Sequence, residues 1–434
     1  MRLTYNNLSP VKLFVGTWVL VHVAAFFGPA GQVYQRYGVV DVTFTPHGFL
    51  WVTACIAAFL VGAKLANQKL LVISSPFRDR VSASDDLNIW DSWRVNVSSI
   101  PILTFAAGIA LLLVYWTAVA IFQVGSLSSF LSTLVQSWHD IRNLWPNQKP
   151  FTGARLLYTG LIGVVIFAAS GIGLTEFSSE GESDSELPSN SRAWLVILTL
   201  GLVPLMILPL LVSQRILLAT AITGGIAAYT ATSDRGISLK YPVGGLLTGM
   251  TVWTSQEVIR AGLSTETIGG SIRYGVSRLL LYFTNDVGNL HRGIKHVSGH
   301  TYGTESFSFV LSYLFIKDEI KGEYFQSVYR ELSLYIGGGG FTGLGVPYLD
   351  FGVFGLILVL IWGYASQSFY IKAKSDIISA QIYGLLASSI VLSWHTSILS
   401  NPLFWFNASL LIVFGTYIPA VELRIMSDRD PESS

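Results

Sequence analysis

The hydrophobic positions of this chain gather into long continuous runs. A helix needs roughly 17 to 25 mostly apolar residues to cross a membrane, because no water is present there to satisfy open backbone groups. The pattern therefore predicts an all-α polytopic transmembrane helical bundle of about ten spans, within a range of roughly nine to twelve. The predicted spans are Val11 to Phe27, Phe49 to Ala66, Ile100 to Phe122, Leu156 to Leu174, Ala193 to Val212, Ile216 to Ala231, Val243 to Val258, Phe351 to Tyr370, Ala380 to Ile398 and Phe404 to Ala420.

The composition supports a membrane protein. Hydrophobic residues make up 51% of the chain and charged residues only 12%, whereas a soluble domain has roughly 25% charged residues. The net charge of +1 gives no reason to expect a nucleic-acid partner. The single cysteine, Cys55, excludes a disulfide or a thiolate metal site within one chain.

The distribution of polar residues divides the chain into three regions. Residues 1–258 are predicted to form an N-terminal helical membrane region with about seven spans, and residues 349–434 a C-terminal membrane region with about three spans and a short tail. Between them, residues 259–348 form a large polar loop, predicted to be partly helical at Ser271 to Phe283 and Ser306 to Phe315. Loops this long are uncommon unless they are functional, so the site is expected here. No internal repeat is visible.

The positive residues of the short loops predict the orientation. Cytoplasmic loops of membrane proteins are enriched in Lys and Arg. A cytoplasmic N-terminus gives this enrichment, makes the loop 259–348 extracytoplasmic and places the C-terminus inside as well. The basic residues then inside are Lys64, Lys69, Arg78, Arg80 and Arg94, then Arg235 and Lys240, then Lys372 and Lys374, then Arg424 and Arg429.

The large loop combines cations, proton-transfer groups and aromatic rings. Arginine side chains match phosphate oxygens in geometry and charge, so a basic site beside a membrane suits a phosphorylated or pyrophosphorylated lipid, and aromatic faces suit sugar rings. The candidates for proton transfer are Asp286, His291, His296 and His300. The candidates for binding diphosphate or glycan are Arg260, Arg273, Arg278, Arg292, Tyr282 and Tyr302, with Arg215 from the start of an apolar helix.

Each candidate also has an ordinary structural interpretation. Loop arginines of a membrane protein are charged simply because they face water, Arg215 can reach the interface by snorkelling, and an exposed histidine is often without a catalytic role. The three histidines of the loop lack an accompanying carboxylate, so the sequence predicts no metal site. The glycines at 337–340 lack a following Gly-Lys-Ser/Thr and are interpreted as flexible backbone that allows close approach, rather than a phosphate-binding loop.

The order of these features resembles the O-antigen or oligosaccharide repeat-unit polymerases, called Wzy-like, and the related O-antigen ligases. The resemblance covers mainly Val212 to Ala365. The residues that carry it are Ser213-Gln214-Arg215, then Tyr274-Gly275-Val276-Ser277-Arg278 to Gly288-Asn289, then Val346-Pro347-Tyr348-Leu349-Asp350-Phe351-Gly352-Val353-Phe354-Gly355.

The resemblance implies a membrane glycosyltransferase that polymerises lipid-diphosphate-linked oligosaccharide repeat units into surface polysaccharide, such as O-antigen, capsule or exopolysaccharide. It implies a multi-pass protein of the cytoplasmic (plasma) membrane that acts at the outer face, needs no cofactor or metal, and works beside a flippase and a chain-length regulator. The substrate would be a polyprenyl-diphosphate-linked oligosaccharide. The acceptor hydroxyl must lose a proton and the leaving diphosphate must be held, which are the roles expected of the two sets of candidates.

Four other functions remain open at the level of sequence. A ligase that transfers a finished glycan is hardly separable from a polymerase. A secondary transporter needs ionisable groups within spans, for which Glu257 and His395 are the candidates. A glycosyltransferase that uses a lipid monophosphate donor typically has an early acidic pair, whereas Asp41 stands alone. A non-enzymatic assembly protein would tolerate neutralisation of the loop arginines.

Overall fold

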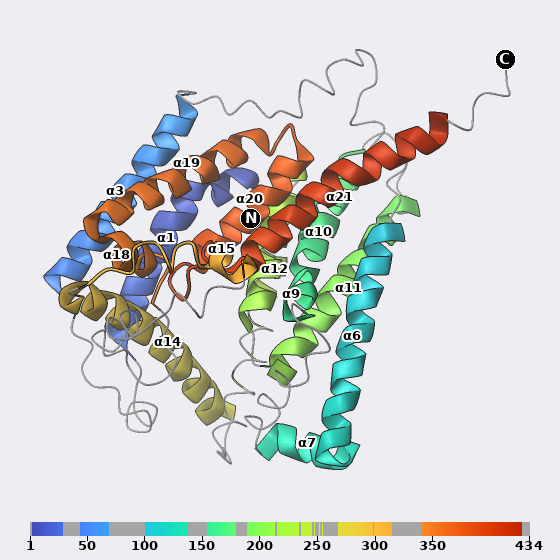
Figure 1. Cartoon of the computed structure of the whole chain (residues 1–434), viewed down its shortest axis with the longest axis horizontal. Coiled ribbons are helices and arrows are strands. Elements are labelled where there is room, and N and C mark those ends of the chain that lie inside the picture. Colours follow the sequence, from blue (N-terminus) through green and yellow to red (C-terminus); the bar gives the residue numbers. More distant parts are fainter. Residues whose placement is uncertain are drawn as a thin grey trace.

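The computed structural model describes residues 2–28, 44–68, 100–136, 154–178, 189–212, 215–233, 236–244, 268–297, 299–314 and 341–427, together with 247, 251 and 254. It is an all-α structure with one very short sheet (Figure 1). Its helices are η1 (Tyr5–Leu8), α1 (Pro10–Phe27), α3 (Pro46–Asn67), α6 (Ile100–Val124), α7 (Leu127–Gln136), α9 (Ala154–Thr159), α10 (Leu161–Ser178), α11 (Ser189–Val212), α12 (Arg215–Thr232), α14 (Ile268–His296), α15 (Ser308–Tyr313), α18 (Gly345–Phe351), η3 (Gly352–Gly355), α19 (Leu356–Lys372), α20 (Ile377–Val391) and α21 (Pro402–Ser427).

Within the described residues, five helices are long and apolar enough to cross a membrane, namely Pro10–Phe27, Pro46–Asn67, Phe105–Val124, Leu156–Leu174 and Gly345–Lys372. Shorter apolar helices occur at Trp194–Met206, Ile216–Thr232, Ile377–Val391 and Pro402–Gly415. The prediction of apolar helices that suit a lipid bilayer is therefore confirmed. The predicted span Val243 to Val258 lies largely outside the described residues.

One boundary prediction is wrong. The run Ala380 to Ile398 was expected to form a single span, but α20 ends at Val391 and a turn follows at residues 392–395. The apolar character continues through Leu392 and Trp394, so hydropathy cannot detect where the helix stops. The turn is held by backbone hydrogen bonds, in which Ser393 N donates to Ile390 O and His395 N donates to Leu392 O.

Close crossings of small residues hold the bundle together. A Cβ added at Gly62 of α3 would lie 2.1 Å from the carbonyl oxygen of Leu360 in α19, and one added at Gly363 would lie 2.3 Å from that of Phe59. Glycines let helix backbones approach closely, and dispersion contacts then replace the hydrophobic drive that lipid cannot supply. Consequently α3 and α19 lie side by side (Figure 1).

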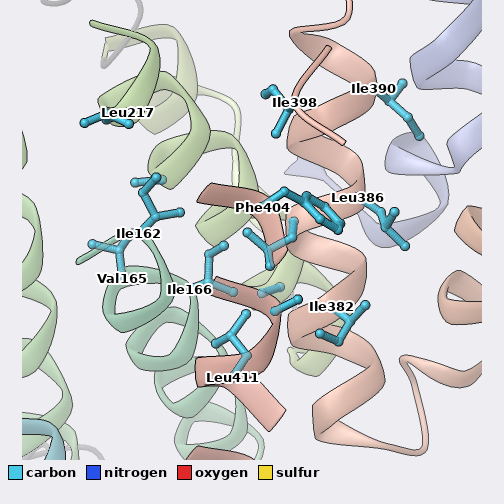
Figure 2. Packing of buried hydrophobic residues seen from close by; sticks show 14 of the residues in the cluster. Ile162, Val165, Ile166, Leu217, Ile382, Leu386, Ile390, Ile398, Phe404 and Leu411 are labelled. Carbon is cyan, nitrogen blue, oxygen red and sulfur yellow. The ribbon is translucent and has the colours of Figure 1, made fainter. Parts of the chain in front are cut away.

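The interior of the bundle is apolar with a few internal hydrogen bonds. Figure 2 shows side chains of α10, α12, α20 and α21 meeting in this core, among them Ile166, Leu386 and Leu411. The Oδ1 atom of Asn407 accepts from Gly163 N at 2.7 Å. Such internal bonds satisfy polar groups that lipid cannot.

The two ends of the bundle gather different parts of the chain. At one end, β1 (Arg2–Leu3) pairs antiparallel with β2 (Ile237–Ser238), with Arg2 opposite Ser238, and the ammonium of Lys374 lies 5.2 Å from the ring centre of Tyr5. At the other end, α14 packs against α1, α3 and α18 (Figure 1). The helix predicted at Ser271 to Phe283 is thus present and extends further, over Ile268–His296.

Candidate functional site

The candidate site is built on one face of α14. Arg278, Tyr282 and Asp286 are spaced by four residues, and side chains at that spacing lie above one another on a helix. Arg278 and Asp286 are buried, with exposed fractions of 9% and 0%, and Tyr282 is half-buried. The guanidinium carbon of Arg278 lies 5.5 Å from the ring centre of Tyr282, so the cation rests over the aromatic face.

Asp286 pairs with a histidine from a distant part of the chain. The Nδ1 atom of His395, in the turn after α20, donates to Oδ2 of Asp286 at 2.7 Å. The side chain of His395 is 30% exposed, whereas that of Asp286 is 0% exposed. Because the carboxylate holds the Nδ1 proton, Nε2 of a neutral His395 carries the lone pair and can accept a proton. The ring of Tyr282 lies edge-on to this imidazole, with centroids 6.0 Å apart.

The electrostatics favour His395 as a base. Burial by itself lowers the pKa of His395, but the hydrogen bond and the negative charge of Asp286 outweigh burial and raise the pKa above the ordinary 6.5. An imidazole that is hydrogen-bonded to a carboxylate in this way has a fixed orientation and is a stronger base than a free imidazole. The pair can therefore take a proton from a hydroxyl and stabilise the resulting imidazolium.

Packing on both sides fixes the pair. Phe283 of α14 packs on Trp394, the neighbour of His395, with ring centroids 4.4 Å apart. On the other side of the turn, Gly343 N donates to Ser393 O at 2.6 Å, and a Cβ at Gly343 would lie 3.1 Å from Ser393. Gly343 therefore allows a close approach to the turn. The glycines at 337–340, for which close approach is predicted, lie outside the described residues.

His291, another predicted proton-transfer group, lies in a different environment. Its ring is fully buried, with Nε2 3.3 Å from Nε2 of His22 in α1 and Nδ1 accepting from Thr45 N at 3.0 Å. Gly48 makes room for it, since a Cβ there would lie 2.2 Å from the ring. Burial and the neighbouring His22 lower the pKa of His291 to about 4, against the hydrogen bond to Thr45. The arrangement ties α14 to α1 and α3 and gives the ring no solvent access.

The remaining predicted residues are dispersed. His296 is exposed near the end of α14, and His300 is half-buried, with Nδ1 3.3 Å from Leu349 O. Tyr302 is exposed on the loop between α14 and α15. On α14, Arg273 is exposed and Arg292 half-buried; Arg215 opens α12 but its side chain is outside the described residues, as is the whole of Arg260.

The sequence indicates His395 only as an ionisable group within a predicted apolar span and does not show that it lies beside Asp286. His22 and Thr45 carried no recognisable signal, because a single polar residue in or beside a span is common. The predicted group that the structure does connect is Arg278, Tyr282 and Asp286 on α14.

The described parts of the chain contain no group of three His, Cys, Asp or Glu residues that could hold a metal ion. No protein-family model, no curated protein and no solved structure matches this chain.

Proposed function

We propose that this protein is a membrane glycosyltransferase that polymerises lipid-diphosphate-linked oligosaccharide repeat units at the outer face of the plasma membrane. The observation that carries the proposal is the buried Asp286 paired with the partly exposed His395, beside Tyr282 and Arg278 on one face of α14. Glycosyl transfer to a hydroxyl requires a base, and transfer from a diphosphate requires a cation.

The proposed reaction uses the pair as the base. Nε2 of His395 removes the proton of the acceptor hydroxyl, whose oxygen bonds to the anomeric carbon of the donor sugar. The bond from that carbon to the diphosphate oxygen breaks, and the leaving group keeps the electron pair. Asp286 stabilises the imidazolium, while Arg278, with Arg292 on the same helix, neutralises the diphosphate.

The ends of the bundle support the proposed orientation. Segments expected inside, namely the N-terminus, residues 237–238 and Lys374, meet at one end. Segments expected outside meet at the other end, where α14 contacts the end of α1 and the beginning of α3 near His22 and Thr45. Together with the shorter apolar helices and the run at 243–258, this arrangement agrees with about ten spans and two cytoplasmic termini.

A secondary transporter is the second candidate, because a buried carboxylate paired with histidine is also a typical proton-carrying group in membranes. The two functions differ in what accumulates when the pair is broken. Without a polymerase, single lipid-linked repeat units are still exported and collect at the outer face, whereas without a transporter the transported compound fails to cross the membrane.

The test compares three variants expressed in cells that lack this chain. We expect His395→Gln and Arg278→Ala to abolish long-chain glycan, while lipid-linked single repeats accumulate and the protein inserts normally. His47→Gln, which alters an exposed histidine at the beginning of α3, is the matched control and should give normal glycan. Unchanged polymer amount and length in both site variants would refute the proposed function.

Purified protein then separates a polymerase from a ligase. A polymerase joins one lipid-linked oligosaccharide to another, so extracted lipid-linked repeats should be the only substrate that the reaction needs. Product that forms only after addition of a lipid-core acceptor would instead identify a ligase.

A further inference from the structure

The backbone of Tyr302 has an unusual conformation. Tyr302 has φ of 48°, and among the described residues it is the only non-glycine residue with positive φ. Its side chain is 72% exposed, so packing in the core does not explain the conformation. A positive φ is strained for a residue with a bulky side chain and persists only where the surrounding structure holds it.

Asp350 holds the backbone around Tyr302 in this conformation. This aspartate of α18 is 0% exposed, and its Oδ1 accepts from the hydroxyl of Thr301 and from Glu305 N, the latter at 3.2 Å. Its Oδ2 accepts from Ser306 N at 2.5 Å, and its backbone oxygen accepts from Tyr302 N at 3.2 Å. Hydrogen bonds to a carboxylate are stronger than neutral ones. Asp350 therefore fixes the loop on both sides of Tyr302.

Two glycines let the loop and α18 fit closely. A Cβ at Gly303, where φ is 91°, would lie 3.0 Å from the ring of Phe351 and 3.1 Å from that of Phe307. A Cβ at Gly352, where φ is 56°, would lie 3.0 Å from Nε2 of His300. The position of Tyr302 is therefore determined by a close-fitting support rather than by its own packing.

The loop that contains Tyr302 and the start of α18 are also hydrogen-bonded to the segment that carries His395. Ser308, at the beginning of α15, donates from its hydroxyl to Ser400 O at 2.6 Å. Gly343, just before α18, donates to Ser393 O. The loop with Tyr302 and the turn with His395 are thus joined through hydrogen bonds at both ends of residues 393–400.

We infer that Asp350 is a positioning residue that presents the ring of Tyr302 as a stacking surface for a sugar of the acceptor glycan, an inference that rests on the proposed glycosyl transfer. Tyrosine offers a rigid apolar face with a polar tip, which suits a hydroxylated ring. After Tyr302, the same loop combines partly exposed Thr304 and Glu305 with the exposed ring of Phe307. Polar groups together with aromatic rings suit a sugar better than the tail of a lipid.

The first experiment measures kinetics with purified full-length protein and lipid-linked oligosaccharide extracted from cells that lack this chain. Tyr302→Ala should raise KM by about three- to tenfold with little change in kcat, and Tyr302→Phe, which keeps the ring and loses only the hydroxyl, should raise KM by less than Tyr302→Ala. Tyr302→Gly should unfold at a higher temperature than Tyr302→Ala, because glycine accepts positive φ without strain, yet have the same raised KM. A purely structural role would leave KM unchanged in the glycine variant.

Asp350→Asn tests the positioning role. The amide replaces one acceptor oxygen with a donor, so the loop loses a hydrogen bond and KM should rise as in Tyr302→Ala. The double variant should be no worse than Tyr302→Ala alone, because both changes remove the same contact. Thr301→Val removes one hydroxyl from the same network and serves as the milder variant should Asp350→Asn fail to fold.

The alternative occupant of this surface is the bilayer. A spin label on Tyr302→Cys gives a direct test, because Cys55 is fully buried and should not react. Greater accessibility to a water-soluble nickel chelate than to oxygen is expected, and the reverse would place the ring in lipid and overturn the inference. Unchanged KM in Tyr302→Ala, with transfer still dependent on His395, would also overturn it and leave the proposed function intact. Failure of the wild type to transfer glycan would refute the proposed function itself, and the stacking surface with it.

Discussion

Replacing Asp286 with asparagine removes one negative charge and keeps the shape of the side chain. The carboxylate accepts from Nδ1 of His395 at 2.7 Å and is 0% exposed, whereas the side chain of His395 is 30% exposed. A hydrogen bond to a charged group contributes about 1.5–3 kcal/mol. Water access at His395 reduces this value, so we expect Asp286→Asn to lower the free energy of unfolding by about 2 kcal/mol while the imidazole is protonated.

The decrease in the free energy of unfolding caused by Asp286→Asn should depend on pH in a defined direction. Burial lowers the pKa of His395, but the bond and charge of Asp286 raise it above 6.5. A group whose pKa is raised on folding stabilises the protein fully below its unfolded pKa, and the stabilisation is lost as pH rises through the folded pKa. The difference in unfolding free energy between the wild type and Asp286→Asn should therefore be largest near pH 6 and should shrink at alkaline pH.

The same substitution changes the pH dependence of glycan transfer. The base must be neutral, so the wild-type rate should rise with pH through a midpoint above 6.5. In Asp286→Asn the negative charge that raises the pKa of His395 is absent, so the midpoint should move below that of the wild type, and the maximal rate should fall about 10²- to 10⁴-fold because the imidazolium loses its charged partner.

The assays are denaturant unfolding of purified protein between pH 6 and pH 9 and transfer of extracted lipid-linked oligosaccharide over the same range. The matched control is Asp376→Asn at the N-cap of α20, where asparagine caps as well as aspartate and no histidine is bound. It should leave the midpoint of the rate profile unchanged. A stability difference that is constant over pH, or a midpoint unmoved by Asp286→Asn, would refute the assignment of His395 as the base held by Asp286.

Two further predictions concern the fold. Gly363→Ala places a Cβ against a carbonyl oxygen of α3 and should lower the free energy of unfolding by about 1–3 kcal/mol. The control, Gly16→Ala, has no atom within 4 Å of the added Cβ and should be neutral or stabilising in thermal unfolding. Equal melting temperatures of the two variants would contradict the close crossing. Reporter enzymes fused after Lys240 should be active in the cytoplasm and those fused after His300 outside it, and the reverse pattern would invalidate the proposed orientation.

Much of the helical architecture follows from local sequence. The runs beginning near Val11, Phe49 and Leu156 are long and apolar, and each coincides with a helix that the structure describes. Local composition is sufficient to predict these helices because a segment that crosses lipid must form a helix of a given length and apolarity. The predicted helix at Ser271 to Phe283 is present, but its continuation to His296 was not predicted, although Val287, Leu290 and Ile294 recur there at helical spacing.

The candidate site could be predicted only in part. The sequence indicated Arg278, Tyr282 and Asp286 through their residue types within the large polar loop. It did not indicate that Asp286 pairs with His395, because the two are separated by 109 positions. Nor did it distinguish His291, which the structure buries against His22 and Thr45, from a histidine with solvent access.

By itself, the amino-acid sequence determined that the chain forms apolar helices suited to a bilayer, and it indicated polar candidate residues between positions 259 and 348. Only the tertiary structure decided which polar groups meet. The lipid bilayer determines the length and apolarity of each helix, and both can be recognised in the local sequence. The rotation and approach of one helix against another depend instead on contacts such as Gly62 with Leu360 and Phe283 with Trp394, which join residues far apart in the chain. The pair of Asp286 and His395, and the support of Tyr302 by Asp350, are consequences of that packing.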